Sequence, residues 1–522
     1  MHTHCSYRSP NVTRRSFLRR TSAAGLLPLL SIHAKESGER PNILFVMTDD
    51  HAQQAIGAYG SVINRTPGID RIGRDGAVFL NNTCCNSICA PSRAAILTGM
   101  HSHANGQRTN ADIFDGSQST FPRLLQAAGY DTALIGKWHL RSDPTGFSHW
   151  EILPGQGHYY NPDFYGPDGV KRRQEGYVTD LITEKSLQWL EGRADKKRPF
   201  LLMCQHKAPH RTWAPNLRHL SLFEDADIPE PPTLFDDFSG RAAGLKKNEM
   251  TIAWHMMLEY DLKMRDLNIP DELGRDFDCP ETARMTPDQL AKWDAFYAPQ
   301  RDEFQKANLS GADLTRWKYQ RYIKDYLRCV ASVDESVGRM LDYLDADGLT
   351  GNTMVVYCSD QGFYLGEHGL YDKRWMYQES LNMPLLIRWP GRIQPGTRVD
   401  ALTQNIDFAP TFLEAAGMDA PDGMQGRSLV PLFRGETPAT WRKSIYYHYY
   451  ETGEHNVPRH EGVATVAYKL IHYYDRNEWE LFDRANDPSE MTSVYDDPAY
   501  QTIRQALARE LDALREQYRV PS

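Results

Sequence analysis

The strongest signal in the hydrophobic pattern of this chain is a pair of short, almost uninterrupted apolar runs. Residues 41–48 read PNILFVMT, and residues 353–358 read TMVVYC. Runs of this length without alternation are typical of strands that are buried on both faces of a parallel sheet. A third run, at residues 199–205, predicts another such strand. The pattern therefore predicts an α/β fold in which distant parts of the chain contribute to one sheet.

The remaining segments predict helices and a second, smaller sheet. Residues 177–190 and 317–344 are predicted to be helical. After about residue 441 the pattern changes to short alternating segments rich in aromatic residues, which is typical of an antiparallel sheet. Residues 500–518 predict an amphipathic helix that closes the chain. The three antiparallel segments are predicted at residues 444–450, 463–474 and 478–482.

One long segment carries no strand pattern. Residues 216–314 are polar and rich in Asp, Pro, Lys and Met, so they predict a partly helical insertion over one rim of the sheet. We therefore expect a large catalytic domain at residues 41–440, which contains this insertion, and a C-terminal subdomain at residues 441–522.

Composition and charge narrow the possible partners. The chain has 522 residues, 41% of them hydrophobic, and its 59 basic and 68 acidic residues give a net charge of −9. Nucleic-acid binding requires a basic surface, so no nucleic-acid partner is expected. If the substrate is a polyanion, a local cluster of Lys, Arg and His must attract it. No stretch reaches the roughly 18 apolar residues of a membrane-spanning helix, so no membrane span is predicted.

The first 34 residues resemble a twin-arginine export signal. Residues 13–19 read TRRSFLR, a short apolar stretch follows at residues 23–30, and cleavage is expected after Ala34. The alternative interpretation is a basic arm on the surface. The export signal predicts a periplasmic or secreted protein that leaves the cytoplasm already folded.

The cysteines do not form a recognised framework. There are eight of them, without a C-x-x-C pair or the density of a disulfide scaffold. Cys84, Cys85 and Cys89 lie close together, but no further Cys or His stands at zinc-finger spacing. A thiol-based redox function is therefore disfavoured. A disulfide from Cys84 or Cys85 remains open.

Polar side chains follow two of the predicted buried strands. Asp49 and Asp50 end the first strand, and Asp360 and Gln361 follow the strand at residues 353–358. Because ligands bind at the carboxyl ends of strands in such sheets, we expect these side chains to meet at one edge. All four offer oxygen, which predicts a hard cation such as calcium. A solvated turn is the alternative for Asp49 and Asp50.

A short motif adds a candidate nucleophile. Residues 89–93 read CAPSR and continue as AAILTG. Pro91 suits the first turn of a helix, so Cys89 is expected at a helix N-terminus, where free amide hydrogens favour an anion. The alternative for the pentapeptide alone is a buried structural thiol.

This motif resembles the signature of the sulfatase family, and the likeness extends from about residue 41 to residue 486. It implies the alkaline phosphatase superfamily fold, with a large mixed sheet flanked by helices and a smaller C-terminal subdomain containing an antiparallel sheet. It also implies that a formylglycine-generating maturation enzyme converts Cys89 to formylglycine. The hydrated aldehyde has two geminal hydroxyls, so that one attacks a sulfate ester and the other later expels the sulfate.

The resemblance also implies roles for individual residues. The implied Ca2+ ligands are Asp49, Asp50, Cys89 as formylglycine, Asp360 and Gln361. The implied catalytic groups are Cys89, Arg93, Lys137, His139, His210 and Lys373. Among these, Arg93, Lys137 and Lys373 are implied to hold the aldehyde hydrate and the sulfate oxygens. His139 is implied to be the base for sulfate release, and His210 to protonate the leaving alcohol. Two positions depart from the family: Gln361 replaces the more usual Asn or His, and Thr212 replaces a proline.

Within the family, three segments resemble the N-acetylglucosamine-6-sulfatase branch and its polysaccharide sulfatase relatives. They are GQGHYYNP at 155–162, KAPH at 207–210 and DKRWMY at 372–377. This branch acts on glycosaminoglycans, mucins and algal polysaccharides. Tyr faces and Arg or His donors suit such sugars. The predicted sugar contacts are His158, Tyr159, Arg211, Arg374, His455, Arg459 and His460.

The leading hypothesis is thus an exported, calcium-dependent sulfatase of a sulfated carbohydrate. A phosphonate or phosphate monoester hydrolase of the same superfamily is the first alternative, because it can carry the same C-x-P-S-R motif. An inactive relative that binds sulfated glycans is the second, and it would be expected to lack one of the catalytic groups that this chain retains.

Overall fold

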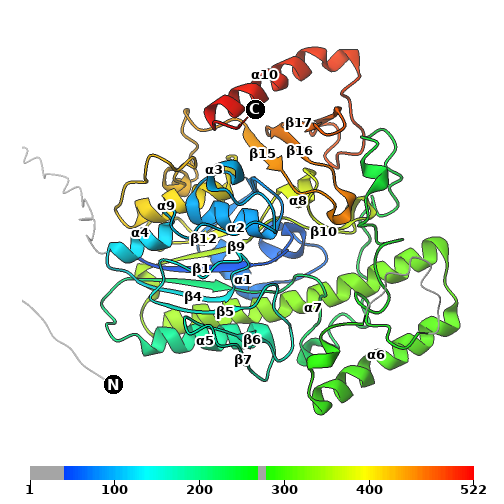
Figure 1. Ribbon diagram of the computed structural model, residues 1–522, viewed down its shortest axis with the longest axis horizontal. Helices are drawn as coiled ribbons and strands as arrows, with labels where there is room; N and C mark the ends of the chain where they lie inside the picture. Colours follow the sequence, from blue (N-terminus) through cyan, green and yellow to red (C-terminus); the bar gives the residue numbers. More distant parts are fainter. Residues whose placement is uncertain (1–39, 268–277, 522) are drawn as a thin grey trace, which may run out of the picture. The chain divides into compact units, whose positions relative to one another are not determined.

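The computed structural model describes residues 40–267 and 278–521 (Figure 1), so the predicted export signal lies outside the described residues. Its centre is an eight-stranded sheet with the order β13-β2-β12-β9-β1-β8-β4-β5. β12 is antiparallel to β9 and β2, whereas the other neighbours are parallel, which confirms the predicted mixed sheet. The strands are β1 (Asn42–Thr48), β2 (Ala77–Phe79), β4 (Asp131–Lys137), β5 (His149–Leu153), β8 (Phe200–Gln205), β9 (Thr353–Ser359), β12 (Leu385–Arg388) and β13 (Thr397–Val399).

The central strand shows why its sequence is apolar throughout. All seven residues of β1 are buried. Alternate side chains enter two different cores, because successive residues of a strand point to opposite faces. Phe45 packs with one layer of helices, and Leu44 with the other. Figure 1 shows the two layers on opposite sides of the sheet. The first layer is α2 (Cys89–Thr98), α4 (Phe121–Ala127) and α9 (Phe408–Ala415), and the second is α1 (Pro67–Arg74), α5 (Val178–Gly192) and α7 (Gly311–Ala346).

The C-terminal part forms the predicted antiparallel sheet. Its four strands follow one another in the order β15-β16-β17-β18, with bounds Ile445–Tyr449, His460–Ala464, Tyr468–Tyr473 and Glu478–Asp483. The segment predicted at residues 463–474 is therefore two strands, because the chain turns between Thr465 and Tyr468. Helix α10 (Gln501–Gln517) covers this sheet through Leu507, Leu511 and Leu514, which share a separate small core with it (Figure 1).

The predicted insertion contains helix α6 (Pro287–Ala307) and 3₁₀ turns, as its sequence suggested. Within the described residues of this segment, strand-like pairing is limited to an isolated antiparallel bridge between Thr251 and Leu370. Short strands make three small additional sheets, and two further helices are α3 (Ser102–Asn105) and α8 (Gln378–Leu381). The small sheets pair β3 (Asn82–Thr83) with β14 (Thr403–Gln404), β6 (Asp163–Phe164) with β7 (Arg172–Arg173), and β10 (Tyr364–Leu365) with β11 (Tyr371–Asp372). None of the helices in residues 40–267 and 278–521 is long and apolar enough to cross a bilayer.

Candidate active site

Four parallel strands end side by side and bring the predicted polar residues together. In the register of the sheet, Thr48 of β1 pairs with Ser359 of β9, so Asp49 and Asp360 leave the same edge. On the other side of β1, Met47 pairs with Gln205, and the loop carrying His210 follows from there. Strand β4 ends beyond β8 with Lys137. The sheet topology therefore gathers groups that lie more than 300 residues apart in the sequence.

The end of β4 depends on a glycine. Gly136 has a φ of +110°, and a Cβ atom there would lie 1.9 Å from the carbonyl oxygen of Gln205. Any side chain would separate β4 from β8, because no real Cβ atom approaches a backbone oxygen so closely. Gly136 thus lets the strands meet directly before Lys137.

Three carboxylates form the centre of the site. Oxygen atoms of Asp49, Asp50 and Asp360 all lie within 4.8 Å of one another, and the three residues are at most 1% exposed. Beside them the Oε1 atom of Gln361 is buried and has no hydrogen-bond partner in the described part of the chain. Buried like charges repel unless a cation compensates them, and an unpartnered buried oxygen is costly. The residues present therefore fit a hard cation with oxygen ligands.

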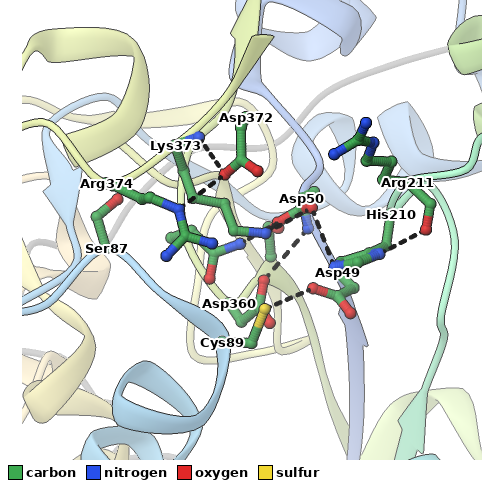
Figure 2. A network of polar contacts seen from close by, with 12 residues as sticks. Asp49, Asp50, Ser87, Cys89, His210, Arg211, Asp360, Asp372, Lys373 and Arg374 are labelled. Carbon is green, nitrogen blue, oxygen red and sulfur yellow. Dashed lines mark hydrogen bonds and ion pairs between the residues drawn. The ribbon is translucent and has the colours of Figure 1, made fainter. Parts of the chain in front are cut away.

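Cys89 lies next to this cluster at the N-terminus of α2. Its Sγ is 3.4 Å from Oδ1 of Asp49 (Figure 2). Asn110 accepts a hydrogen bond from the backbone N–H of Ala90 at 3.0 Å, and so caps the first turn of this helix. Burial raises the pKa of the Cys89 thiol to about 12. That is the opposite of what an unmodified cysteine nucleophile needs.

Three cations surround the carboxylates. Arg93 binds Asp360 through Nε at 3.0 Å, and its Nη1 donates to the carbonyl oxygen of Lys137 at 2.8 Å. Lys137 forms an ion pair with Asp49. Lys373, which follows β11 directly, donates to both oxygens of Asp50 at 2.6 and 2.7 Å (Figure 2). The site therefore pairs buried acids with buried bases, and an anionic group entering it would meet ammonium and guanidinium donors.

Two histidines complete the set. His210 donates through Nδ1 to the carbonyl oxygen of Arg211 at 2.6 Å, so its Nε2 is free to face Asp50, 3.7 Å away. Burial, together with Lys137 and other nearby ammonium groups, lowers the pKa of His210 well below its usual value. His139 is partly buried, and desolvation together with Lys137, Arg93 and other nearby cations lowers its pKa well below its usual value.

Backbone strain marks the same region. Asp50, His139, Asp372 and Arg374 are non-glycine residues with φ between +60° and +87°. This left-handed conformation is costly for residues with a Cβ atom and persists where surrounding contacts hold it. Each of the four residues stands at the end of a strand or directly beyond one, next to the buried acids and bases.

The candidate site adjoins a pocket of about 590 Å³. Cys89, His210 and Lys373 line it together with residues of the predicted insertion and of the C-terminal part. Its lining comprises Cys89, Asn110, Pro154, Gln156, Gly157, His158, Lys207, His210, Arg211, Thr212, Tyr260, Pro280, Glu281, Asp372, Lys373, Arg374, Glu451, Glu454 and His455.

Four of the predicted sugar contacts, His158, Arg211, Arg374 and His455, line this pocket. Arg374 lies 3.4 Å from Glu451 and 3.5 Å from Asp372, and His455 contacts Asp372 at 3.0 Å. This part of the pocket lining therefore contains both acids and bases, which suits recognition of hydroxyl groups and charged substituents.

The other three predicted contacts, Tyr159, Arg459 and His460, are not among the residues that line this pocket. Tyr159 is fully buried, and its hydroxyl donates to the carbonyl oxygen of His210. His460 is also fully buried, and its ring stacks near Tyr449. Arg459 pairs with Asp475 on the surface at 2.9 Å. Packing in the interior accounts for Tyr159 and His460, and a surface ion pair accounts for Arg459. The sequence alone does not distinguish these environments from a substrate-binding one.

Conversely, the sequence did not predict several of the residues that line the pocket. Lys207 and Gln156 lie inside two of the motifs quoted for the sulfatase branch, so their motif position was the available signal. Asn110, Tyr260 and Glu281 had no such signal, because tertiary packing alone brings their segments to the pocket.

Among the cysteines of the described residues, Cys89 alone lines this pocket. Within residues 40–267 and 278–521 all cysteines are free and buried, including Cys84 and Cys85. The disulfide that the sequence left open is therefore absent from this structure.

A pocket with lysine, arginine and histidine side chains, beside a buried carboxylate cluster that could hold a metal ion at the carboxyl edge of an α/β sheet, is typical of hydrolases that act on anionic esters. Comparison with known proteins identifies the family. The sulfatase family model matches residues 41–418, and the model of the C-terminal region of N-sulphoglucosamine sulphohydrolase matches residues 366–517.

Individual relatives agree with this result. The N-acetylglucosamine-6-O-sulfatase of Bacteroides thetaiotaomicron is 46% identical, over 99% of this chain and 94% of that protein. A solved structure of a protein in complex with its substrate D-glucosamine-2-N,6-O-disulfate is 47% identical with a TM-score of 0.89, over 92% of this chain and 98% of that one. The phosphonate monoester hydrolase of Agrobacterium radiobacter shares the fold at 20% identity and a TM-score of 0.67, over 92% of this chain and 96% of that one.

The chain belongs to the sulfatase family, as its sequence motif indicated. It has the alkaline phosphatase-like fold of that family and is a sulfuric ester hydrolase.

Proposed function

We propose that this sulfatase hydrolyses sulfate esters of a carbohydrate, and that its substrate unit is a 6-O-sulfated glucosamine of the glycosaminoglycan or mucin type. The observation that carries the proposal is the position of Cys89, 3.4 Å from Asp49 at the base of a pocket lined by Lys373, His210 and Arg374. The high identity to the N-acetylglucosamine-6-O-sulfatase over almost the whole chain supports the choice of sugar.

We propose Ca2+ as the metal, held by Asp49, Asp50, Asp360, Gln361 and the modified residue 89. When bound, it supplies positive charge that stabilises the developing charge on the sulfate oxygens. Residue 89 as hydrated formylglycine supplies the attacking oxygen and the second hydroxyl through which the sulfate is released. A separate maturation enzyme must make this modification.

The chain's own residues move the protons. Asp49 Oδ1 lies next to the side chain of residue 89 and is placed to accept the proton of the attacking hydroxyl. As the ester S–O bond breaks, His210 Nε2 donates a proton to the departing alkoxide. The bound sulfate ester brings negative charge beside this imidazole and so favours its protonated form. His139 is the base for the second hydroxyl.

The cations bind and orient the sulfate group. Lys373 and Lys137 each pair with a carboxylate of the metal cluster. Their remaining N–H donors can bind sulfate oxygens, while Arg93 fixes Asp360. Arg211, Arg374, His455 and His158 remain the proposed sugar contacts.

The experiment that tests this function compares initial rates on D-glucosamine 6-sulfate and on the matching 6-phosphate, with 4-nitrophenyl sulfate and phosphate as a second pair. We expect the sulfate ester to be turned over faster in both pairs. Dominant turnover of phosphate or phosphonate esters would instead identify the phosphorus-ester hydrolase. Binding of the sugar sulfate without turnover, in protein whose residue 89 is modified, would identify an inactive relative.

Cys89→Ala is the matched variant for the nucleophile. We expect turnover to be abolished and the melting temperature to remain within a few degrees, because a single small side chain at the edge of the core is lost. Mass spectrometry of the peptide that contains residue 89 should find formylglycine in the parent protein. Equal activity of the variant would refute the role of residue 89.

We also propose that residues 1–34 direct export by the twin-arginine route, and that the protein acts in the periplasm or outside the cell. The support is the TRRSFLR segment and the apolar stretch that follows it. Replacing Arg14 and Arg15 by Lys should retain the protein in the cytoplasmic fraction. We further propose the division into a catalytic domain at residues 41–440 and a C-terminal subdomain at residues 441–522.

A further inference from the structure

Tyr159 contacts His210 but is not part of the pocket lining. It is fully buried, whereas its neighbour His158 lines the pocket. Its hydroxyl donates a hydrogen bond to the backbone carbonyl oxygen of His210, with an O···O distance of 2.6 Å. It therefore contacts the backbone of a predicted catalytic residue without reaching the substrate.

The peptide that Tyr159 contacts, between His210 and Arg211, is bonded directly to the next peptide, whose carbonyl oxygen orients the imidazole. Nδ1 of His210 donates to the carbonyl oxygen of Arg211 at 2.6 Å (Figure 2), and Lys207 donates to the same oxygen at 3.3 Å. The hydrogen bond from Nδ1 leaves Nε2 as the nitrogen that faces Asp50. Movement of the peptide between His210 and Arg211 would consequently move Nε2.

Three residues, Glu281, Lys207 and Tyr177, hold Tyr159 in place. Oε2 of Glu281, a residue of the predicted insertion that is 2% exposed, accepts the backbone N–H groups of Tyr159 at 2.8 Å and Tyr160 at 3.0 Å. The ammonium group of Lys207 lies 4.9 Å from the centre of the Tyr159 ring. The ring of Tyr177 is stacked on it with a centroid distance of 5.8 Å.

We propose that Tyr159 is a positioning residue: its hydroxyl, anchored through Glu281, fixes the His210 backbone so that Nε2 meets the leaving oxygen of the substrate. This inference rests on the proposed role of His210 as the proton donor. Proton donation matters most for poor leaving groups such as a sugar alkoxide, and least for nitrophenolate. A loss that depends on the leaving group is therefore the signature that separates positioning of His210 from a general structural role.

The test is Tyr159→Phe, which removes a single oxygen atom from a buried ring. We expect kcat/KM for D-glucosamine 6-sulfate to fall about tenfold, because small displacements of a catalytic group are costly. For 4-nitrophenyl sulfate the fall should stay below about twofold, since this leaving group needs little protonation.

Tyr177→Phe is the matched control. Its hydroxyl is buried in the same aromatic cluster and donates to the carbonyl oxygen of Ala214 at 2.9 Å, four residues beyond His210. The two variants should lower the melting temperature similarly, but Tyr177→Phe should keep the wild-type ratio of the two rates. If both variants change this ratio equally, or if neither changes it, the positioning role is overturned.

A double-mutant cycle with His210→Ala completes the test. If Tyr159 acts through His210, Tyr159→Phe should cause no further loss on the sugar sulfate in the His210→Ala background. A full additional tenfold loss there would overturn the inference while the role of His210 stands. If His210→Ala itself lowers kcat/KM for both substrates equally, the proposed role of His210 as proton donor and the inference fail together.

Discussion

For single residues, whether a charged side chain lines the pocket or lies on the surface depends on its surroundings rather than on its residue type. Arg211 and Arg459 were both predicted to contact sugar. Arg211 lines the pocket and binds Asp261 through two hydrogen bonds of 2.6 and 2.8 Å, with Asp261 fully buried. Arg459 forms a similar pair with Asp475 but on the surface. The sequence cannot distinguish the two, because burial is set by the packing of distant segments.

This contrast leads to a prediction about stability. Asp261→Ala should lower the free energy of unfolding by about 3 kcal/mol, because it leaves the guanidinium of Arg211 largely buried without its partner. Asp168→Ala is the control, since Asp168 and Arg172 also lie 2.6 Å apart but are about half exposed. Denaturant titration should find no measurable change for the control. Equal effects of the two substitutions would contradict the importance of burial at Arg211.

A second residue-scale prediction concerns Gln361, which stands where sulfatases often have Asn or His. Its buried and unpartnered Oε1 is available to a metal ion. Gln361→Leu removes this oxygen at similar volume, so we expect the affinity for Ca2+ to fall at least about tenfold. Gln361→Glu, which keeps an oxygen donor, should retain tighter binding than the Leu variant. Calorimetric titration of Ca2+ into each variant measures this, and unchanged affinity in Gln361→Leu would exclude Gln361 as a ligand.

Among the secondary structure elements, apolar runs predicted the buried strands well. Strands β1, β8 and β9 lie within a residue or two of their expected bounds, because continuous apolar sequence has few alternatives in a large α/β core. Strand β4 was not identified, since it begins at the half-buried Asp131 and ends in Gly136 and Lys137. Its glycine is explained by the close approach of β8, which only the folded sheet reveals.

The short helix η7 (Glu367–Gly369), between β10 and β11, leads to a prediction about pH. His368 is fully buried, lies 3.1 Å from Asp236 and 3.7 Å from Glu379, and has Arg241 at 2.9 Å and Glu367 beside it in the chain. Although burial opposes it, the hydrogen bond with Asp236 and the nearby carboxylate of Glu379 raise the pKa of His368 to about 9.

Because this pKa is higher than the roughly 6.5 of an unfolded histidine, the protonated form stabilises the fold. The stabilisation is complete below about pH 6.5 and is lost as the pH rises through about 9, by an amount of the order of 2 to 3 kcal/mol. Chemical denaturation at a series of pH values measures it. His368→Gln should remove this part of the pH dependence, and an unchanged profile in that variant would assign the effect to another group.

For the molecule as a whole, the candidate active site joins segments that are distant in the sequence. Asp49 and Asp50 follow β1, Asp360 follows β9, and Cys89 begins α2. The sequence predicted these members because each follows a recognisable strand or motif. It could not predict Glu281 or Asn110, which reach the pocket from loops and whose roles depend on contacts with other segments.

Because the carboxylates come from two strands and repel one another, binding of a cation should stabilise the entire fold. A ligand that binds only the folded state at 100 times its Kd contributes about 2.7 kcal/mol to the free energy of unfolding. We therefore expect chelation to lower the melting temperature by a few degrees and added Ca2+ to restore it. Asp360→Asn, which removes one ligand charge but keeps the size of the side chain, should melt at a temperature that responds weakly to Ca2+. If chelator and Ca2+ leave the melting temperature of the parent protein unchanged, the three buried carboxylates are compensated by Arg93, Lys137 and Lys373 alone.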